Sequence, residues 1–295
     1  MTNRATPAFD ALRDACAEIG IDARSAEPIR IAENEIWRLP QGVIVRIAPP
    51  DRFQSAAREI KVARWLAGHE VPVVRALHVE QPLERGGRVL TFWQEVPPHR
   101  HGSTQDVALA LKELHGLPLP DFDIGRLDPF VRVPERLRAA RTLTGDDRKW
   151  LTSLYEELVE RWNAGLPPGL ATAPVHGDAW PGNVVRLERG GRLLMDLERF
   201  SAGPPEWDLV STAVRTKTTG AVAEAEYNAF CDTYGHDVTT WAGYEVLASA
   251  RELRMVTYAA QHAATNPQWR AEAQHRVDCL RGRGGPRPWR WTGIL

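Results

Sequence analysis

Polar side chains able to hold a cation or accept a proton crowd into residues 175–208. They are His176, Asp178, Asn183, Asp196, Glu198 and Asp208. A Glu188–Gly191 turn joins two short apolar runs, so a hairpin is predicted, and the residues between Asp178 and Glu198 are expected to converge at its open end. Three carboxylates and an amide that close repel each other unless a cation lies among them. Mg²⁺ suits such ligands and is usually held by one or two carboxylates plus substrate phosphates, so the stretch indicates phosphoryl transfer.

Each of these residues taken singly also has a structural explanation. His176 is explained as a buried histidine, Asp178 as a cap or turn residue, Asn183 as turn chemistry and Glu198 as a surface charge. The spacing H-G-D-x₄-N, followed by Asp196, is far more specific. In phosphoryl transfer an Asp accepts the proton of the acceptor hydroxyl, an Asn shortly after it holds one Mg²⁺, and a later Asp holds the metal that bridges the phosphates.

The composition is that of an ordinary globular protein. The 295 residues allow one large or two medium domains, and a net charge of −1 gives no reason to expect a nucleic-acid partner. The sequence has no apolar run long enough for a membrane span, and its N-terminus lacks the apolar core of a signal peptide. The three cysteines are far apart, which favours free thiols and a cytoplasmic location. The oligomeric state is open between monomer and homodimer.

The chain has no P-loop, because no lysine follows a glycine. The lysines are Lys61, Lys112, Lys149 and Lys217. A nucleotide must therefore be bound by another device.

The part of the chain before residue 97 is rich in predicted strands. Strands are expected at residues 29–31, 36–39, 43–47 and 89–93, and a helix at 53–67. The first three strands form an antiparallel meander with a turn at Pro40–Gly42. Arg46 lies in the apolar third strand, where an arginine needs a partner. Glu59 in the helix is the expected carboxylate, although a helix glutamate taken alone is more often solvated.

The predicted secondary structure changes after Gln94–Val96. Residues 99–104 are polar and are predicted to be irregular, and beyond them the chain is mainly helical apart from the hairpin. Helices are expected at residues 104–115, 133–142, 146–163, 207–216, 221–234 and 241–263. We therefore predict two domains, 1–96 and 97–295.

The segments HGDAWPGNVV and LLMDLERFSAGPPEWDL resemble the aminoglycoside phosphotransferase family, whose members are small-molecule kinases with a protein-kinase-like fold. GVIVRIAPP and EIKVARWLAGHEVPVVRAL are similar to the third strand and the glutamate-bearing helix of that family, and the resemblance covers roughly residues 25–263. It implies an α+β fold of two lobes, with an antiparallel sheet and a helix in the N-lobe. The C-lobe would be mostly helical and carry the catalytic hairpin.

The resemblance also implies an activity and roles in the catalytic stretch. The γ-phosphoryl group of ATP (or GTP) would move to a hydroxyl of a small-molecule acceptor. Asp178 resembles the catalytic aspartate and His176 the residue that braces its loop. Asn183 and Asp196 resemble the Mg²⁺ ligands, and Glu198 would support Asp196 or a metal-bound water.

Further roles concern the nucleotide. Arg46 and Glu59 resemble the pair that positions the α- and β-phosphates of the nucleotide. Asp208 resembles the structural aspartate that follows the metal site. Asn34 lies in the first turn, AENE, where a loop would cover the phosphates. The hinge that reads the adenine edge would be Gln94, Glu95 and Val96. The chain departs from the family pattern in two ways: Arg46 stands where the best-known members have lysine, and the AENE turn has no glycine.

The acceptor is less well defined by the sequence. Residues 221–252 contain six acids and one base, Arg251. If these residues line the acceptor pocket, a cation such as an aminoglycoside fits, but a solvated acidic face explains them equally well. Another antibiotic, an amino sugar, or a choline-like or homoserine-like alcohol are alternatives. A different class of function is a pseudokinase that binds a nucleotide as a sensor.

Overall fold

The computed structural model describes residues 7–31 and 34–293, and the chain divides into two compact units. The first unit comprises Met1–Gly102, Pro120–Ile124 and Pro181–Phe200. The second unit comprises Ser103–Leu119, Gly125–Trp180 and Ser201–Leu295. The predicted hairpin therefore belongs to the first unit although it comes late in the sequence. The division into domains 1–96 and 97–295 stays a prediction.

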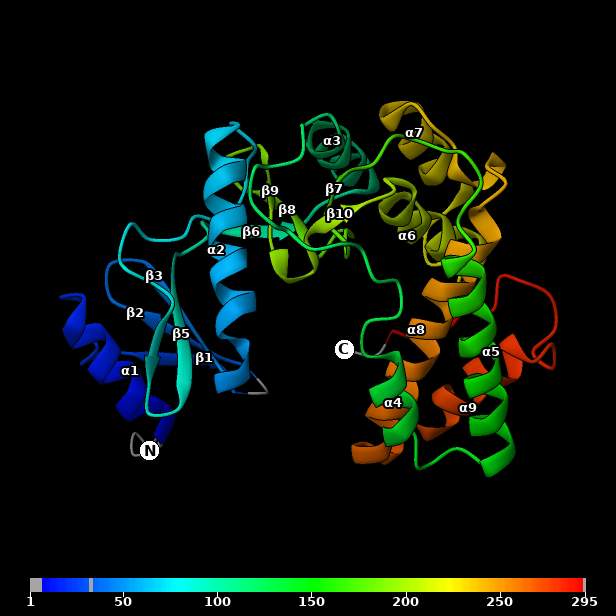
Figure 1. The fold of residues 1–295 in the computed structure, drawn as a ribbon, viewed down its shortest axis with the longest axis horizontal. Coiled ribbons are helices and arrows are strands. Elements are labelled where there is room, and N and C mark those ends of the chain that lie inside the picture. Colours follow the sequence, from blue (N-terminus) through cyan, green and yellow to red (C-terminus); the bar gives the residue numbers. More distant parts are fainter. Residues whose placement is uncertain (1–6, 32–33, 294–295) are drawn as a thin grey trace. The chain divides into compact units, whose positions relative to one another are not determined.

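The first unit contains an antiparallel five-stranded sheet in the order β1-β2-β3-β5-β4 (Figure 1). The strands are β1 (Glu27–Arg30), β2 (Glu35–Leu39), β3 (Val43–Ala48), β4 (Leu83–Arg85) and β5 (Arg88–Gln94). Leu39 pairs with Val43 across the predicted turn, where Gln41 and Gly42 have φ values of 68° and 71°. Glycine adopts this left-handed conformation without strain, which explains its place in the turn.

Two helices lie on either side of this sheet (Figure 1). α1 (Pro7–Glu18) packs against the face that carries Val45. α2 (Phe53–Gly68) packs against the opposite face, which carries Ala48. Because side chains alternate along a strand, Arg46 shares the face of Ala48 and points to the side of α2. The short 3-10 helix η1 (Pro50–Arg52) links β3 to α2.

A second sheet of the first unit has the order β6-β8-β9 and contains the predicted hairpin. β8 (Val184–Leu187) and β9 (Arg192–Leu194) are antiparallel, with Gly190 and Gly191 at positive φ in the turn. The prediction of irregular structure after residue 98 was wrong, because β6 (His99–His101) pairs with β8 through main-chain hydrogen bonds. All three residues of β6 are exposed, so no apolar alternation marks this strand in the sequence. The 3-10 helix η2 (Leu197–Arg199) follows β9.

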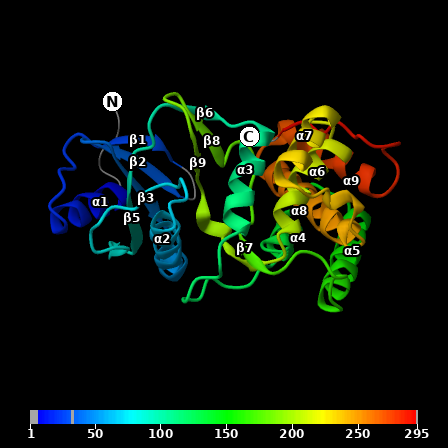
Figure 2. The ribbon, with the colours of Figure 1, turned by 90° about the horizontal axis from the view of Figure 1, so that it is seen from above.

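The second unit is mainly helical (Figure 2). Its helices are α3 (Thr104–His115), α4 (Val133–Ala139), α5 (Gly145–Asn163), α6 (Glu206–Lys217), α7 (Glu224–Tyr234), α8 (Tyr244–Thr265) and α9 (Arg270–Leu280), with short 3-10 helices η3 (Val238–Thr240) and η4 (Pro267–Trp269). The long helix α8 contacts α4, α5, α6 and α9. Alanines on its buried surface leave little side chain between the helices and so allow this close packing. Two predictions needed correction: α4 ends before Thr142, and α9 was not predicted.

One strand of a small two-stranded sheet directly precedes the loop His176–Asp178. β7 (Ala173–Val175) and β10 (Ser201–Gly203) are antiparallel, with Val175 opposite Ser201. All three residues of β7 are buried. The residues that follow Val175 therefore start from a fixed position in the core of the second unit.

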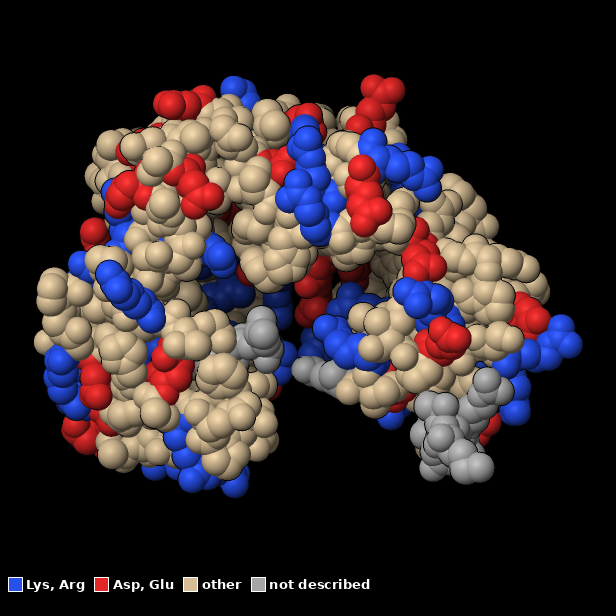
Figure 3. All heavy atoms as spheres, turned by 180° about the vertical axis from the view of Figure 1, so that it is seen from behind, with Lys and Arg blue, Asp and Glu red and all other residues tan. Residues whose placement is uncertain are grey.

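The surface shown in Figure 3 carries both signs of charge. Lys and Arg side chains are interspersed with Asp and Glu side chains over this face. A mixed surface of this kind produces no extended field of one sign. Separately, the described helices include none with the length and apolar character needed to span a membrane.

Candidate active site

The loop His176–Asp178 is fixed by a buried carboxylate. Asp208, on α6, is fully buried and accepts hydrogen bonds from the backbone amides of His176 at 2.7 Å and Gly177 at 2.8 Å. Gly177 has a φ of 83°, which a residue with a side chain adopts only with strain. The loop therefore leaves β7 in one defined direction, and the side chain of Asp178 at its end is 42% exposed.

Asp208 also binds a side chain from another helix. The Nε2 atom of His115, the last residue of α3, lies 3.2 Å from the Asp208 carboxylate, and its Nδ1 atom lies 2.9 Å from the hydroxyl of Tyr234. Burial raises the pKa of Asp208, but the hydrogen bond from His115 and the nearby Arg251 guanidinium hold the pKa below its usual value. Asp208 thus joins α3, α6 and the loop as a buried anion.

A residue that the sequence did not suggest for the site lies next to Asp178. The buried Arg251, on α8, approaches Asp178 with its Nη1 atom 3.5 Å from Oδ1. In the sequence Arg251 is only one base in an acidic stretch, and nothing in its spacing marks it. Its partner lies 73 positions earlier, so only the fold reveals the pair.

In the first unit Arg46 is shared between two carboxylates. Its Nη1 atom lies 3.0 Å from Glu59 on α2, and its Nη2 atom lies 3.1 Å from Glu198 on η2. Glu198 also lies 3.5 Å from Arg199. Arg46 and Glu59 are thus brought together as expected, whereas Glu198, expected beside the metal, pairs with arginines. One guanidinium therefore links the sheet, α2 and the segment after β9.

The carboxylates around Arg46 outnumber it. Burial raises the pKa of Glu59 to about 7, because the effect of Arg46 is countered by the negative charges of Asp196 and Glu198. Asp196 itself has φ 55° and ψ 71°, a left-handed conformation that is uncommon outside glycine. Backbone strain of this kind collects at functional sites, where the surrounding structure maintains it.

Glu59 should make stability depend on pH. A glutamate whose pKa is higher in the folded state stabilises the protein below its unfolded pKa, and this contribution is lost as the pH rises through the folded pKa. We expect the free energy of unfolding to fall between about pH 4.5 and pH 7, by roughly 3 kcal/mol at about 1.4 kcal/mol per pKa unit. Glu59→Gln should flatten this slope, as measured by urea unfolding across that range.

The control for this experiment is the exposed Glu84, since Glu84→Gln should keep the wild-type slope. A difference between wild type and Glu59→Gln that stays constant from pH 4.5 to pH 7 would contradict the raised pKa.

The predicted Mg²⁺ ligands flank the hairpin. The amide of Met195 donates to the carbonyl of Asn183 at 2.8 Å, so the residue before Asp196 lies opposite Asn183. Amide and carboxylate oxygens suit Mg²⁺, and the excess negative charge around Arg46 favours a cation, so these residues fit the metal. Within residues 7–31 and 34–293, no group of three or more His, Cys, Asp or Glu side chains is arranged to hold a metal ion, in contrast to the expected convergence of three carboxylates.

The predicted hinge lies at the end of β5. The amide of Gln94 donates to the Arg75 carbonyl at 2.8 Å, and the amide of Glu95 donates to the Gly42 carbonyl at 2.7 Å. These two amides therefore serve the first unit itself. Among the described residues, none accepts a backbone hydrogen bond from the amide of Val96.

The predicted phosphate-covering turn is only partly described. Asn34 lies in a bend just before β2 and is partly exposed. Ala32 and Glu33 of the same turn lie outside the described residues. The neighbouring Glu35 accepts a hydrogen bond from the Trp37 indole at 3.1 Å.

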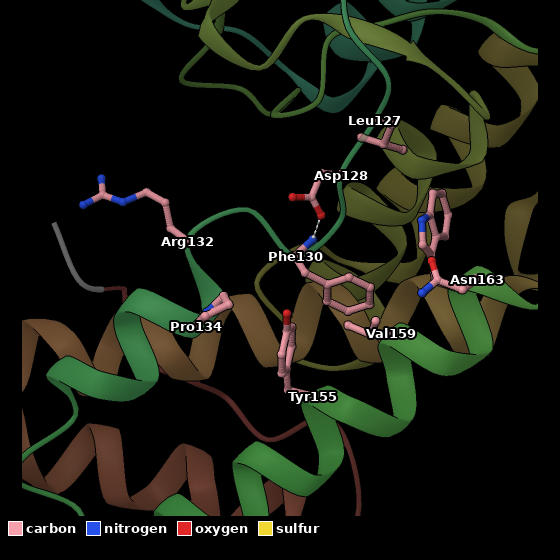
Figure 4. Close-up of a pocket in the computed structure, with 9 residues that line it drawn as sticks. Leu127, Asp128, Phe130, Arg132, Pro134, Tyr155, Val159 and Asn163 are labelled. Atoms are coloured by element: carbon pink, nitrogen blue, oxygen red, sulfur yellow. Dashed lines mark hydrogen bonds between the residues drawn. The ribbon is translucent and has the colours of Figure 1, made fainter. Parts of the chain in front are cut away.

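The second unit contains a pocket between the loop after residue 126 and α5 (Figure 4). Its volume is about 410 Å³, and it is lined by Leu127, Asp128, Phe130, Arg132, Pro134, Tyr155, Val159, Trp162 and Asn163. The rings of Phe130 and Tyr155 meet edge to face at 5.7 Å. The Leu127 amide donates to the Ala202 carbonyl of β10 at 2.9 Å, which connects the pocket wall to the strand pair whose strand β7 precedes the His176–Asp178 loop.

The acidic stretch from residue 221 to 252 does not line this pocket. Glu252 is buried and paired with Arg287 at 2.8 Å, and Glu224 is paired with Lys217 at 2.7 Å. Asp237 accepts a hydrogen bond from Tyr227 at 2.7 Å. These acids thus have structural partners.

A family model described as the phosphotransferase enzyme family matches residues 25–248, which is most of the chain. The chain matches none of the curated proteins. Similar solved structures include choline kinase LicA from Streptococcus pneumoniae, with 15% identity, a TM-score of 0.62, and coverage of 92% of this chain and 98% of that one.

Two further structures are similar. Amicoumacin kinase hAmiN, in complex with AMP-PNP, Ca²⁺ and Ami, has 13% identity and a TM-score of 0.66, with coverage of 89% of this chain and 92% of that one. An aminoglycoside-3'-phosphotransferase of type VIII has 21% identity and a TM-score of 0.58, with coverage of 84% and 98% respectively. At these identities the likeness shows the fold alone, and it confirms the predicted α+β, protein-kinase-like fold.

Proposed function

Because the chain belongs to the phosphotransferase enzyme family, we propose that it moves the γ-phosphoryl group of ATP or GTP to a hydroxyl of a small molecule. The observation that carries this proposal is the loop His176–Asp178. Its first two amides are fixed on the buried Asp208, and its last side chain is left accessible. Rigid placement of an accessible carboxylate is what a general base needs.

In the proposed reaction Asp178 accepts the proton of the acceptor hydroxyl as the acceptor oxygen bonds to the γ-phosphorus. The bond between the γ-phosphorus and the bridging oxygen breaks, and ADP or GDP leaves. Asn183 and Asp196 would hold Mg²⁺, which when bound offsets the charge on the phosphates. The protein's remaining contribution is position and electrostatics.

Arg46 would bind phosphate oxygens of the nucleotide. Its guanidinium is held from α2 by Glu59 and from η2 by Glu198, so its direction is set before the nucleotide arrives. The planar fork of arginine matches phosphate geometry and replaces the lysine of related kinases. At the hinge, the amide of Val96 is the donor we assign to the adenine, because the amides of Gln94 and Glu95 donate to the carbonyls of Arg75 and Gly42 in the first unit.

The acceptor would bind in the second unit. The pocket in Figure 4 offers the aromatic rings of Phe130 and Tyr155, and Arg132 at its edge is paired with Glu135 at 3.1 Å. Aromatic faces together with the carboxylate of Asp128 suit an alcohol that also carries an amine. Aminoglycosides, amino sugars and choline-like alcohols share this chemistry.

We place the enzyme in the cytoplasm, because ATP is abundant in that compartment.

The test combines binding with turnover. Thermal unfolding is measured with ATP and GTP, each with and without Mg²⁺, and nucleotide consumption is followed over a panel of hydroxyl acceptors. We expect a stabilisation that requires Mg²⁺, and turnover with at least one amine-bearing alcohol. Stabilisation without turnover on any acceptor would favour a nucleotide-binding sensor, and the absence of both would contradict the proposal.

A further inference from the structure

Arg251 is a buried cation with several partners in the second unit. It is 6% exposed, and its guanidinium lies over the Trp207 ring, 4.0 Å from the ring centre. Its Nη2 atom donates to the carbonyl oxygens of Gly177 and Trp207, both at 3.2 Å. Burying a guanidinium carries a large desolvation cost, so a position of this kind needs compensating contacts.

The remaining compensation comes from the carboxylate of Asp178. The Nη1 atom of Arg251 lies 3.5 Å from Oδ1 of Asp178. The Arg251 side chain is 8% exposed and that of Asp178 is 42% exposed, so the pair joins a buried cation to an accessible anion. The carboxylate is therefore contacted from its protein side by a buried cation.

The same guanidinium also fixes the backbone next to Asp178. The Gly177 carbonyl accepts from Arg251 and from the Trp207 indole at 3.0 Å, while the Gly177 amide donates to Asp208. Both polar backbone groups of Gly177 are thus held by side chains from α6 and α8. Arg251 contacts the peptide before Asp178 and the Asp178 carboxylate together.

We propose that Arg251 is a positioning residue for phosphoryl transfer, which holds the carboxylate of Asp178 in place. This inference rests on the proposed function, in which Asp178 accepts the proton. The charged or titratable neighbours are Asp178 in the loop and Asp208 on α6, with His176 and His115 beside Asp208.

The first experiment compares Arg251→Gln, which removes the charge, with Arg251→Lys, which keeps it. Turnover is measured as ATP hydrolysis with Mg²⁺, in which water takes the place of the acceptor and gives its proton to Asp178. For Arg251→Gln we expect kcat to fall by at least about tenfold, because the carboxylate of Asp178 loses the partner that holds it in place. Since Arg46 lies in the other unit, the KM for ATP should stay within about twofold.

Arg251→Lys should recover part of kcat, because a lysine keeps the charge but lacks the planar fork. Arg254→Gln is the matched control, because Arg254 lies one turn further along α8 and over the same Trp207 ring, at 5.4 Å. This control should leave kcat within about twofold of the wild-type value. A kcat for Arg251→Gln within about twofold of wild type, or equal losses of kcat in Arg251→Gln and Arg251→Lys, would overturn the proposal.

The second experiment needs no activity. The urea midpoints of wild type, Asp178→Ala, Arg251→Gln and the double variant form a double-mutant cycle, because each of these single changes removes the contact. If Arg251 holds Asp178, the midpoint of the double variant falls by less than the sum of the two single decreases. Additive decreases would overturn the inference even in an active enzyme. Coupled midpoints in a protein without any turnover would support the contact and count only against the proposed function.

Discussion

Asp178→Asn is expected to lower kcat for phosphoryl transfer by between about 10²- and 10⁴-fold, the range that general-base catalysis contributes. Asparagine keeps the size of the side chain and can still accept a hydrogen bond from Arg251, but it cannot take the proton of the acceptor hydroxyl. Arg46 and Glu59, which we propose to position the nucleotide, lie in the first unit. The Kd for ATP should therefore stay within about twofold, as measured by calorimetry in parallel with turnover.

Asp14→Asn serves as the control for this prediction. Asp14 lies on α1 with a side chain that is 61% exposed, and its replacement should leave both kcat and the Kd for ATP unchanged. Near-normal turnover in Asp178→Asn would show that Asp178 does not take part in the reaction. A comparable loss of ATP affinity would instead point to a role in nucleotide binding.

Asp208→Asn is expected to lower the free energy of unfolding by roughly 3–5 kcal/mol, the cost of breaking a buried charged network. The wild-type carboxylate accepts from the amides of His176 and Gly177 and from His115. An asparagine presents one NH₂ group where an acceptor is needed, so a buried amide loses its partner. Urea unfolding followed by tryptophan fluorescence measures the loss, since Trp207 lies in the same unit.

The effect of Asp208→Asn should depend on pH. Because the pKa of Asp208 is lowered in the folded protein, its contribution to stability is present above the unfolded pKa and is lost as the pH falls through the folded pKa. The difference in the free energy of unfolding between wild type and Asp208→Asn should therefore become smaller as the pH is lowered. Asp232→Asn, at an exposed position on α7, should have the same free energy of unfolding as wild type at each pH. Equal stabilities of wild type and Asp208→Asn at pH 7 would rule out the anchoring role.

The elements that the sequence predicted well are those with a strong local signal. The β8–β9 hairpin is marked by the Gly190–Gly191 pair between two apolar runs, and α3 by its apolar spacing. The arrangement of Arg46 with Glu59 followed from the need of a buried arginine for a partner. In each case the residues that carry the signal lie close together in the sequence.

The elements that the sequence missed depend on contacts between distant segments. β6 has three exposed residues and exists because β8 supplies its hydrogen bonds. α9 buries Arg276, so its inward face does not read as apolar. Arg251 gains its place from carbonyl oxygens of Gly177 and Trp207 on other elements. No local pattern encodes these partners, so the site beyond its motif could not be assembled from the sequence.

The pairing of β6 with β8 has a consequence for synthesis. Residue 101 leaves the ribosome long before residue 184, and at about 5–20 residues per second the delay is roughly 4–17 s. Until then residues 99–101 have no partner strand, and unpaired main-chain groups are a known risk for association with other chains. A fragment ended at Gly102 would leave these residues unpaired permanently, because β8 and β9 come from beyond residue 180. The ribosome begins the first unit before the second, but it completes the first unit only after it has made much of the second.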